Sequence, residues 1–178
     1  VALEAAGQRI EGIEGSVNWD LSSQWVEARL EGGGPALGEA SLAVSYMTES
    51  QSGSLTMSFT PQGRTEPATA ELAFQRQESG LRLSRISAKV ADQRVTGDGC
   101  WVSEPDPALQ VELTSDSIDL DRLQAWLPAS EGKGEPAIVL PFGLRARLSA
   151  ARVRSGDIIG HQVELAAGEP PDCTGMAD

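Results

Sequence analysis

The sequence predicts an all-β domain, mainly an antiparallel meander with a curved or groove-like sheet, and one short helix near residues 117–127. Two observations support this fold class. Short runs in which apolar and polar residues alternate are typical of half-buried strands. Turn-forming residues separate these runs at intervals of roughly 10–15 residues, which leaves no room for crossover helices between parallel strands.

The expected strands follow one another from the second quarter of the chain onward. The alternation is clearest in the runs 42–46, 55–59, 72–74, 81–84, 86–90, 109–113, 144–148 and 163–165. The apolar stripe changes phase after Leu83, which predicts a β-bulge or a short break near Arg85. Glu78-Ser79-Gly80 predicts a hairpin turn, and Gly97-Asp98-Gly99 is interpreted as a bend or a bulge.

One segment has helical spacing. Its apolar residues fall mainly on one side of a short helix, and they are Ile118, Leu120, Leu123, Trp126 and Leu127. We expect Ser117 to be its N-cap, Asp119 and Asp121 to lie in its first turn, and Pro128 to end it. The following polar and glycine-rich segment, 129–136, is predicted to be a flexible, exposed loop.

Length and charge limit the classes of function. The 178 residues suit one β-rich domain or one segment of a longer architecture. A net charge of −12 disfavours nucleic acid as a partner, because it repels phosphate backbones at long range. No run approaches the ~20 apolar residues that a membrane-spanning helix needs, so we expect any membrane anchor to lie outside this segment.

The two cysteines leave two alternatives open. Cys100 and Cys173 are too far apart in sequence for a local metal motif, and His161 is the one histidine, so a Cys/His zinc site is excluded. A disulfide in an oxidising compartment and two free thiols are both compatible with the sequence.

No residue pattern points to catalysis, a metal or another cofactor. His161 has no neighbouring nucleophile and is expected on the surface or at an edge. The acidic cluster Asp116, Asp119 and Asp121 lacks the central glycine and terminal glutamate of a calcium loop. A hydrolase acting on an envelope polymer would need converging acids, and no aromatic sugar platform accompanies them. We therefore expect a protein that is not an enzyme.

Strands with one apolar face need a cover for that face. An exposed stripe of aliphatic side chains along many strands would cost tens of kcal/mol at roughly 25 cal/mol per Å². The cover is the sheet folded on itself, the short helix, or a bound apolar ligand. The first would be a closed β-sandwich, and the other two describe an open, grooved sheet. The pattern alone leaves these alternatives open.

The stretch from 67 to 128 resembles the AsmA family of Gram-negative envelope proteins, including its TamB-like relatives. It contains an apolar hairpin at 72–83, a glycine-containing strand at 95–99 and a strand at 107–113. The run from Ile118 to Arg122, Ile-Asp-Leu-Asp-Arg, is similar to a Leu-Asp-Leu-Asp-Arg phrase of that family, with Ile in the first place. The later runs 142–148 and 158–165 resemble the family's following strands.

The resemblance implies a periplasmic segment of a protein anchored in the inner membrane. Such proteins form a β-groove that binds phospholipids and conveys them toward the outer membrane, and they influence outer-membrane assembly. The expected partners are a phospholipid or another acyl-chain ligand, together with envelope proteins, and the family has no catalytic residues. The alternative is a closed β-sandwich, structural or protein-binding, without a lipid ligand.

If the chain binds lipid, the apolar faces of the central strands are the predicted lining. The residues expected to contact acyl chains are Leu72, Phe74, Leu81, Leu83, Leu109, Val111 and Leu113. Hydrocarbon would be held there by dispersion and desolvation rather than by specific polar contacts.

Overall fold

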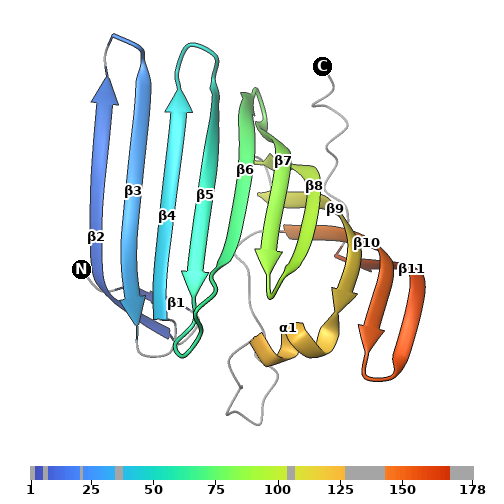
Figure 1. Ribbon diagram of the computed structural model, residues 1–178. Helices are drawn as coiled ribbons and strands as arrows, with labels where there is room; N and C mark the ends of the chain where they lie inside the picture. Colours follow the sequence, from blue (N-terminus) through green and yellow to red (C-terminus); the bar gives the residue numbers. More distant parts are fainter. Residues whose placement is uncertain are drawn as a thin grey trace.

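The computed structural model describes residues 3–5, 8–20, 22–34, 38–103, 107–126 and 143–168. These residues form one open sheet of eleven strands that lie side by side in chain order (Figure 1). One short helix lies between the ninth and tenth strands in the sequence. The predicted all-β, mainly antiparallel meander with one short helix is thereby confirmed.

The first five strands are β1 (Leu3–Ala5), β2 (Gln8–Asp20), β3 (Trp25–Gly34), β4 (Gly38–Met47) and β5 (Ser52–Thr60). The next four are β6 (Ala68–Gln77), β7 (Gly80–Val90), β8 (Gln93–Val102) and β9 (Ala108–Asp119). After helix α1 (Leu120–Trp126) come β10 (Gly143–Ser155) and β11 (Ile158–Ala167).

One neighbouring pair of strands is parallel. β9 and β10 run in the same direction, with Ala108 opposite Gly143 and Asp119 opposite Arg154. The expectation that no crossover interrupts the meander is wrong at this point. The segment 120–142 between the two strands is longer than the about twelve residues that a parallel crossover requires, and its first part is α1.

The bulge predicted near Arg85 is confirmed, and the extra residue belongs to β7. The pairing of β7 with β8 shifts between Leu83 and Ile86, and Arg85 between them has a φ of 53°. Of the two interpretations of Gly97-Asp98-Gly99, the bend is wrong, because these residues lie inside β8. They do lie at a bulge, since Asp98 is the residue of β8 opposite the bulged residues of β7. The hairpin at Glu78-Ser79-Gly80 is confirmed, since Gln77 pairs with Gly80.

Helix α1 begins two residues later than the predicted N-cap implies. Ser117 and Ile118 still belong to β9, and the N-cap is Asp119, whose Oδ1 accepts a hydrogen bond from the Arg122 amide at 3.1 Å. The Gln93 side chain holds Asp119 extended by bonding both its backbone amide, at 2.7 Å, and its carbonyl, at 2.9 Å. The predicted loop 129–136, Leu127 and Pro128 lie outside the described residues.

The sheet has no second layer over it in the described ranges. The buried apolar side chains there are Leu83, Cys100, Ala108, Ile118, Trp126 and Ala150. A closed β-sandwich would bury alternate residues of nearly every strand, so that alternative is wrong for this part of the chain. Cys100 is disulfide-bonded, and Cys173, the other cysteine of the sequence, lies outside the described residues.

Candidate functional site

Strand pairing aligns apolar residues into continuous rows across the sheet. One row crosses all ten strands from β2 to β11 without a charged residue, and it consists of Trp19, Val26, Tyr46, Gly53, Phe74, Leu83, Gly99, Val111, Ala146 and Ala167. Residues opposite one another in a sheet project from the same face. The row is therefore a continuous apolar strip on one face.

A second row runs beside the first. It contains Val17, Ala28, Val44, Leu55 and Leu72, and beyond the β7 bulge it continues with Ile86, Gly97, Leu113, Leu148 and Leu165. We call the side of the sheet that carries these two rows the apolar face. It is formed by alternate residues of every strand from β2 to β11.

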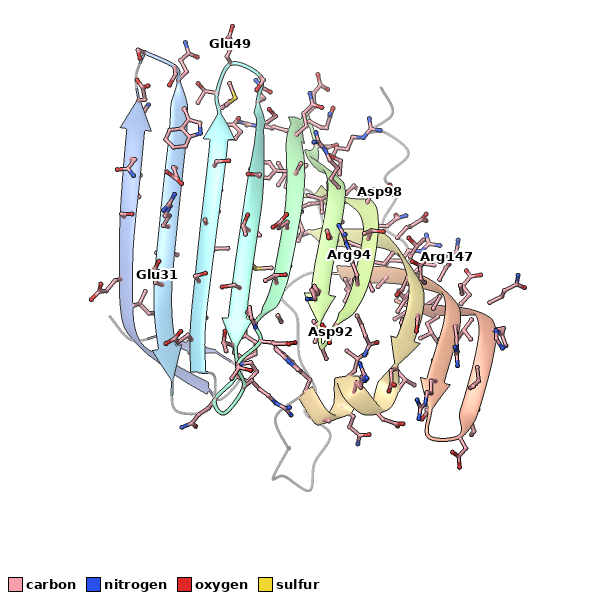
Figure 2. The ribbon with its side chains drawn as sticks, viewed as in Figure 1. Glu31, Glu49, Asp92, Arg94, Asp98 and Arg147 are labelled. Carbon is pink, nitrogen blue, oxygen red and sulfur yellow. The ribbon has the colours of Figure 1, made fainter. Side chains whose placement is uncertain are left out.

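The opposite side of the sheet is polar. Serine hydroxyls bond across neighbouring strands there, with Ser41 Oγ 2.8 Å from Ser58 Oγ. Arg147 forms an ion pair with Glu164 at 2.8 Å between β10 and β11. Figure 2 labels Glu31, Arg94, Asp98 and Arg147, which project from alternate positions to those of the apolar rows. The polar side is suited to water, and the apolar face is not.

Large side chains of the apolar face remain exposed. Val17 is 71% exposed, Trp19 67%, Leu165 52% and Met57 43%. Contiguous apolar patches larger than a few hundred Å² are rare on soluble proteins and mark interaction surfaces. Covering the apolar face would therefore lower the free energy of the system.

Glycines allow the sheet to curve toward the apolar face. Gly97 belongs to the apolar face, and a Cβ added there would collide with the backbone carbonyl of Glu112 on β9. A side chain directed to the apolar side would meet the neighbouring backbone, so β9 lies on that side of β8. The apolar face is thus the concave side at this point, and Figure 1 shows the later strands turning out of the plane of the first ones.

Gly53 has a second role within the apolar face. The rings of Tyr46 on β4 and Phe74 on β6 stack with centroids 6.1 Å apart and planes 8° apart. Gly53 lies between them in the row, and a Cβ there would meet the Phe74 ring at 2.5 Å. The aromatic rings cover the glycine and keep the row continuous.

Helix α1 lies across one end of the apolar face. Trp126 meets the ring of Phe59 edge to face, with centroids 5.6 Å apart, and Phe59 belongs to the apolar side of β5. The Arg64 guanidinium donates to the Ala125 carbonyl, and the Gly156 amide donates to Asp121 Oδ2 at 2.7 Å. The helix thus links the β5 end of the sheet to the β10–β11 turn.

A shallow apolar hollow lies at the same end, over β3 to β5. Its volume is about 320 Å³, and its lining includes Leu30, Ala40, Leu42, Met57 and Phe59. Glu31, Ser41 and Ser58 also line the hollow, although strand alternation directs their side chains to the polar side of the sheet. A hollow of this composition accepts hydrocarbon and offers few hydrogen bonds.

The seven predicted lining residues all lie on the apolar face. Phe74, Leu83 and Val111 belong to the first row, and Leu72 and Leu113 to the second. Leu81 and Leu109 extend the face through Trp101, which pairs with both. Leu83 is buried at 8% exposure, and the other six are partly exposed.

The apolar face is wider than the predicted set of residues. It also includes the exposed side chains of Val17, Trp19, Leu30, Met57, Leu144 and Leu165. In the N-terminal part, the sequence signal for this face is that Val17 and Trp19, and likewise Val26, Ala28 and Leu30, are separated by single polar residues. Glycines and glutamates next to those positions weaken it.

In the described ranges we also looked for a metal site, a role for the histidine and a membrane-spanning helix. No group of three His, Cys, Asp or Glu residues there is placed to hold a metal ion. His161 is exposed on β11, where it pairs with Arg152. Within the same ranges, no helix is both long and apolar enough to cross a membrane.

Comparison with protein-family models finds no match to this chain. Comparisons with curated proteins and with solved structures likewise find none. The functional proposal therefore rests on the geometry of the apolar face and on the residues that form it.

Proposed function

We propose that this chain is a non-enzymatic lipid-binding segment of a cell-envelope protein of the AsmA type, located in the periplasm. Acyl chains lie on the concave apolar face, and the opposite face meets water. The observation that carries the proposal is the row of apolar residues and glycines that crosses ten strands of an open sheet.

The chemistry of the face favours hydrocarbon over a protein partner. Protein interfaces contain about one hydrogen bond per 100–200 Å² of buried area. In the first row, the only polar side-chain groups are the indole N–H of Trp19 and the hydroxyl of Tyr46. Acyl chains need no such bonds, because dispersion and release of water hold them.

The dimensions of the face also suit an acyl chain. The apolar stretch of β10 from Leu144 to Ala150 extends over about 20 Å at ~3.3 Å per residue. One leaflet contributes half of the ~30 Å hydrocarbon core of a bilayer. A single strand of the sheet is therefore long enough to lie along one lipid tail.

The test compares two neighbouring residues of β5 that project from opposite faces. Met57 lines the apolar hollow, and Thr56 is exposed on the polar side. We expect Met57→Asp to weaken binding of a fluorescent phosphatidylcholine about tenfold, because a carboxylate cannot be buried against hydrocarbon without a large desolvation cost.

Thr56→Asp is the matched control, since it adds the same charge to the same strand. We expect it to leave the dissociation constant unchanged, with folding of both variants checked by circular dichroism. Equal loss of binding in the two variants, or wild-type protein that binds no lipid, would contradict the proposal. A wild-type protein that self-associates through this face instead would favour the interaction-module alternative.

A further inference from the structure

The sheet opens between β8 and β9. β8 and β9 pair from Val102 and Ala108 down to Thr96 and Thr114, and no pair follows. Beyond that point side chains bridge the gap, with Ser115 Oγ donating to the Arg94 carbonyl at 2.8 Å. The Gln93 amide makes its two hydrogen bonds to Asp119 on the far side of the gap. The opening holds a hollow of about 420 Å³.

Four of the 14 basic residues of the chain line this opening. They are Arg94 from β8, Arg122 from α1, and Arg152 and Arg154 from β10. Three aspartates line it as well: Asp92, Asp116 and Asp119. The opening therefore gathers charge, in contrast to the uncharged apolar rows beside it.

The charges of the opening are only partly paired with one another. Arg122 is 3.9 Å from Asp119, and Asp92 is 3.5 Å from Lys89. Arg94 bonds the hydroxyl of Ser87, and Arg154 bonds the Gly156 carbonyl. Outside the strand pairing of their backbones, the side chains of Arg152 and Asp116 make no hydrogen bond or ion pair with the part of the chain that the structure describes. Three guanidinium groups thus have no carboxylate partner there.

The apolar stripes of β9 and β10 end at the same level, next to the opening. On β9 the stripe of Leu109, Val111 and Leu113 gives way to Ser115 and Ser117. On β10 the stripe ends at Ala150, which pairs with Ser115, and Arg152 follows opposite Ser117. Along these two strands the surface changes from aliphatic to cationic, as a phospholipid changes from tail to headgroup.

We propose that this opening binds the phosphate group of a phospholipid headgroup whose tail lies on the apolar face, with Arg152 and Arg154 on the apolar side of β10 and Arg94 lining the opening from the polar side of β8. This inference rests on the proposed lipid function and adds a specific polar contact to it. Guanidinium groups bind phosphate through charge-assisted, bidentate hydrogen bonds. The unpaired carboxylate of Asp116 in the same hollow favours a zwitterionic headgroup, whose ammonium group it can accept.

The net charge of −12 does not oppose this site. Ionic screening limits the reach of exposed charges to about 8 Å at physiological ionic strength. Acidic residues elsewhere on the sheet therefore act weakly on a phosphate held between three guanidinium groups. A zwitterionic headgroup also has no net charge for the whole protein to repel.

The test measures binding of three probes to the full chain. The probes are a short-chain phosphatidylethanolamine below its critical micelle concentration, the diacylglycerol with the same tails, and soluble glycerol phosphate. We expect the wild-type protein to bind the phosphatidylethanolamine about tenfold more tightly than the diacylglycerol, because only the former can bond the arginines. Arg152→Gln should abolish this preference and leave diacylglycerol binding unchanged.

Matched variants separate a local effect from a general loss of charge. Arg145→Gln removes the same charge from the polar side of β10 and should keep the tenfold preference. Arg94→Gln removes a guanidinium from the other wall of the opening and should reduce the preference, which provides a second readout if Arg152→Gln folds poorly.

The possible binding results distinguish failure of the phosphate site from failure of the lipid function. Equal affinity of the wild-type protein for both lipids would overturn the phosphate site and leave the lipid function standing. Binding of glycerol phosphate without either lipid, sensitive to Arg152→Gln, would retain a phosphate site and overturn the lipid function. Binding of none of the three probes would overturn both, and a preference that survives Arg152→Gln and Arg94→Gln would overturn the assignment to this opening.

Discussion

Asp20 ends β2 and accepts hydrogen bonds from the two serines that follow in the turn. Its Oδ1 is 2.7 Å from Ser22 Oγ and 2.9 Å from the Ser22 amide, and its Oδ2 is 2.7 Å from Ser23 Oγ. These bonds, that of the Ser22 hydroxyl first, stabilise the carboxylate and lower the pKa of Asp20 from 3.8 to about 2.

This shift predicts how the turn responds to acid. Because the folded pKa lies below the unfolded one, the stabilising contribution is complete above about pH 4 and is lost as the pH falls toward 2. An NMR titration of the Asp20 carboxyl should give a pKa near 2. The double change Ser22→Ala and Ser23→Ala should return it toward 3.8, and a wild-type value already near 3.8 would contradict the assigned bonds.

At the same scale, glycines explain one error of the sequence interpretation. Gly97-Asp98-Gly99 has the composition of a turn, and composition alone cannot separate a turn from a close backbone approach. The position of β9 against β8, which requires Gly97 to lack a side chain, depends on residues distant in sequence. The bulge at Arg85 could be predicted, because the phase of the apolar stripe changes within one strand.

Among the elements, α1 connects β5, near the middle of the described sheet, with the β10–β11 turn. Its last residue, Trp126, packs against Phe59, which precedes it by more than sixty positions in the sequence. We predict that this pair couples by about 1 kcal/mol beyond the area it buries, as edge-to-face aromatic pairs do. A double-mutant cycle of Phe59→Leu and Trp126→Leu in urea unfolding measures this coupling.

Two further variants serve as the reference for that cycle. Tyr46→Leu with Trp126→Leu should show additive losses, because Tyr46 stacks on Phe74 and not on the helix. A coupling near zero for the Phe59 and Trp126 pair would mean that α1 does not hold the end of the sheet as described.

Local pattern can predict elements only where the alternation is regular. Apolar spacing predicts the helix, yet the start of the helix depends on Gln93, which extends β9 through Asp119 by two hydrogen bonds from another strand. β2 and β3 have no counterpart among the predicted runs. Their alternating apolar residues are interrupted by Gly12 and Gly15 and by a register shift between Glu11 and Glu14.

For the whole molecule, the decisive property is that one face of the sheet is uncovered in the described ranges. The sequence shows that each strand has an apolar side, but it cannot show whether a second layer covers it. That choice depends on how far the sheet curves and on where its edge strands end. The seven predicted lining residues fall on one face because period-two alternation fixes their side, whereas the extent of the face follows from strand order and register.

The opening between β8 and β9 could not be predicted from the sequence, for a related reason. Arg94, Arg122, Arg152 and Arg154 are scattered over sixty positions. They converge because β10 returns parallel to β9, a pairing that the alternation pattern does not predict. Sites assembled by a crossover connection are visible only once the order of the strands is known.

The most direct measurement maps where an acyl chain touches the protein. A phospholipid with a photoactivatable group in its tail is bound to the full chain, and the modified residues are located by peptide mass spectrometry. The account predicts adducts on alternate residues, Leu55 and Met57 on β5 and Leu144 and Leu148 on β10, with Thr56 and Arg147 unmodified. Adducts spread equally over both sides of these strands, or none at all, would contradict it.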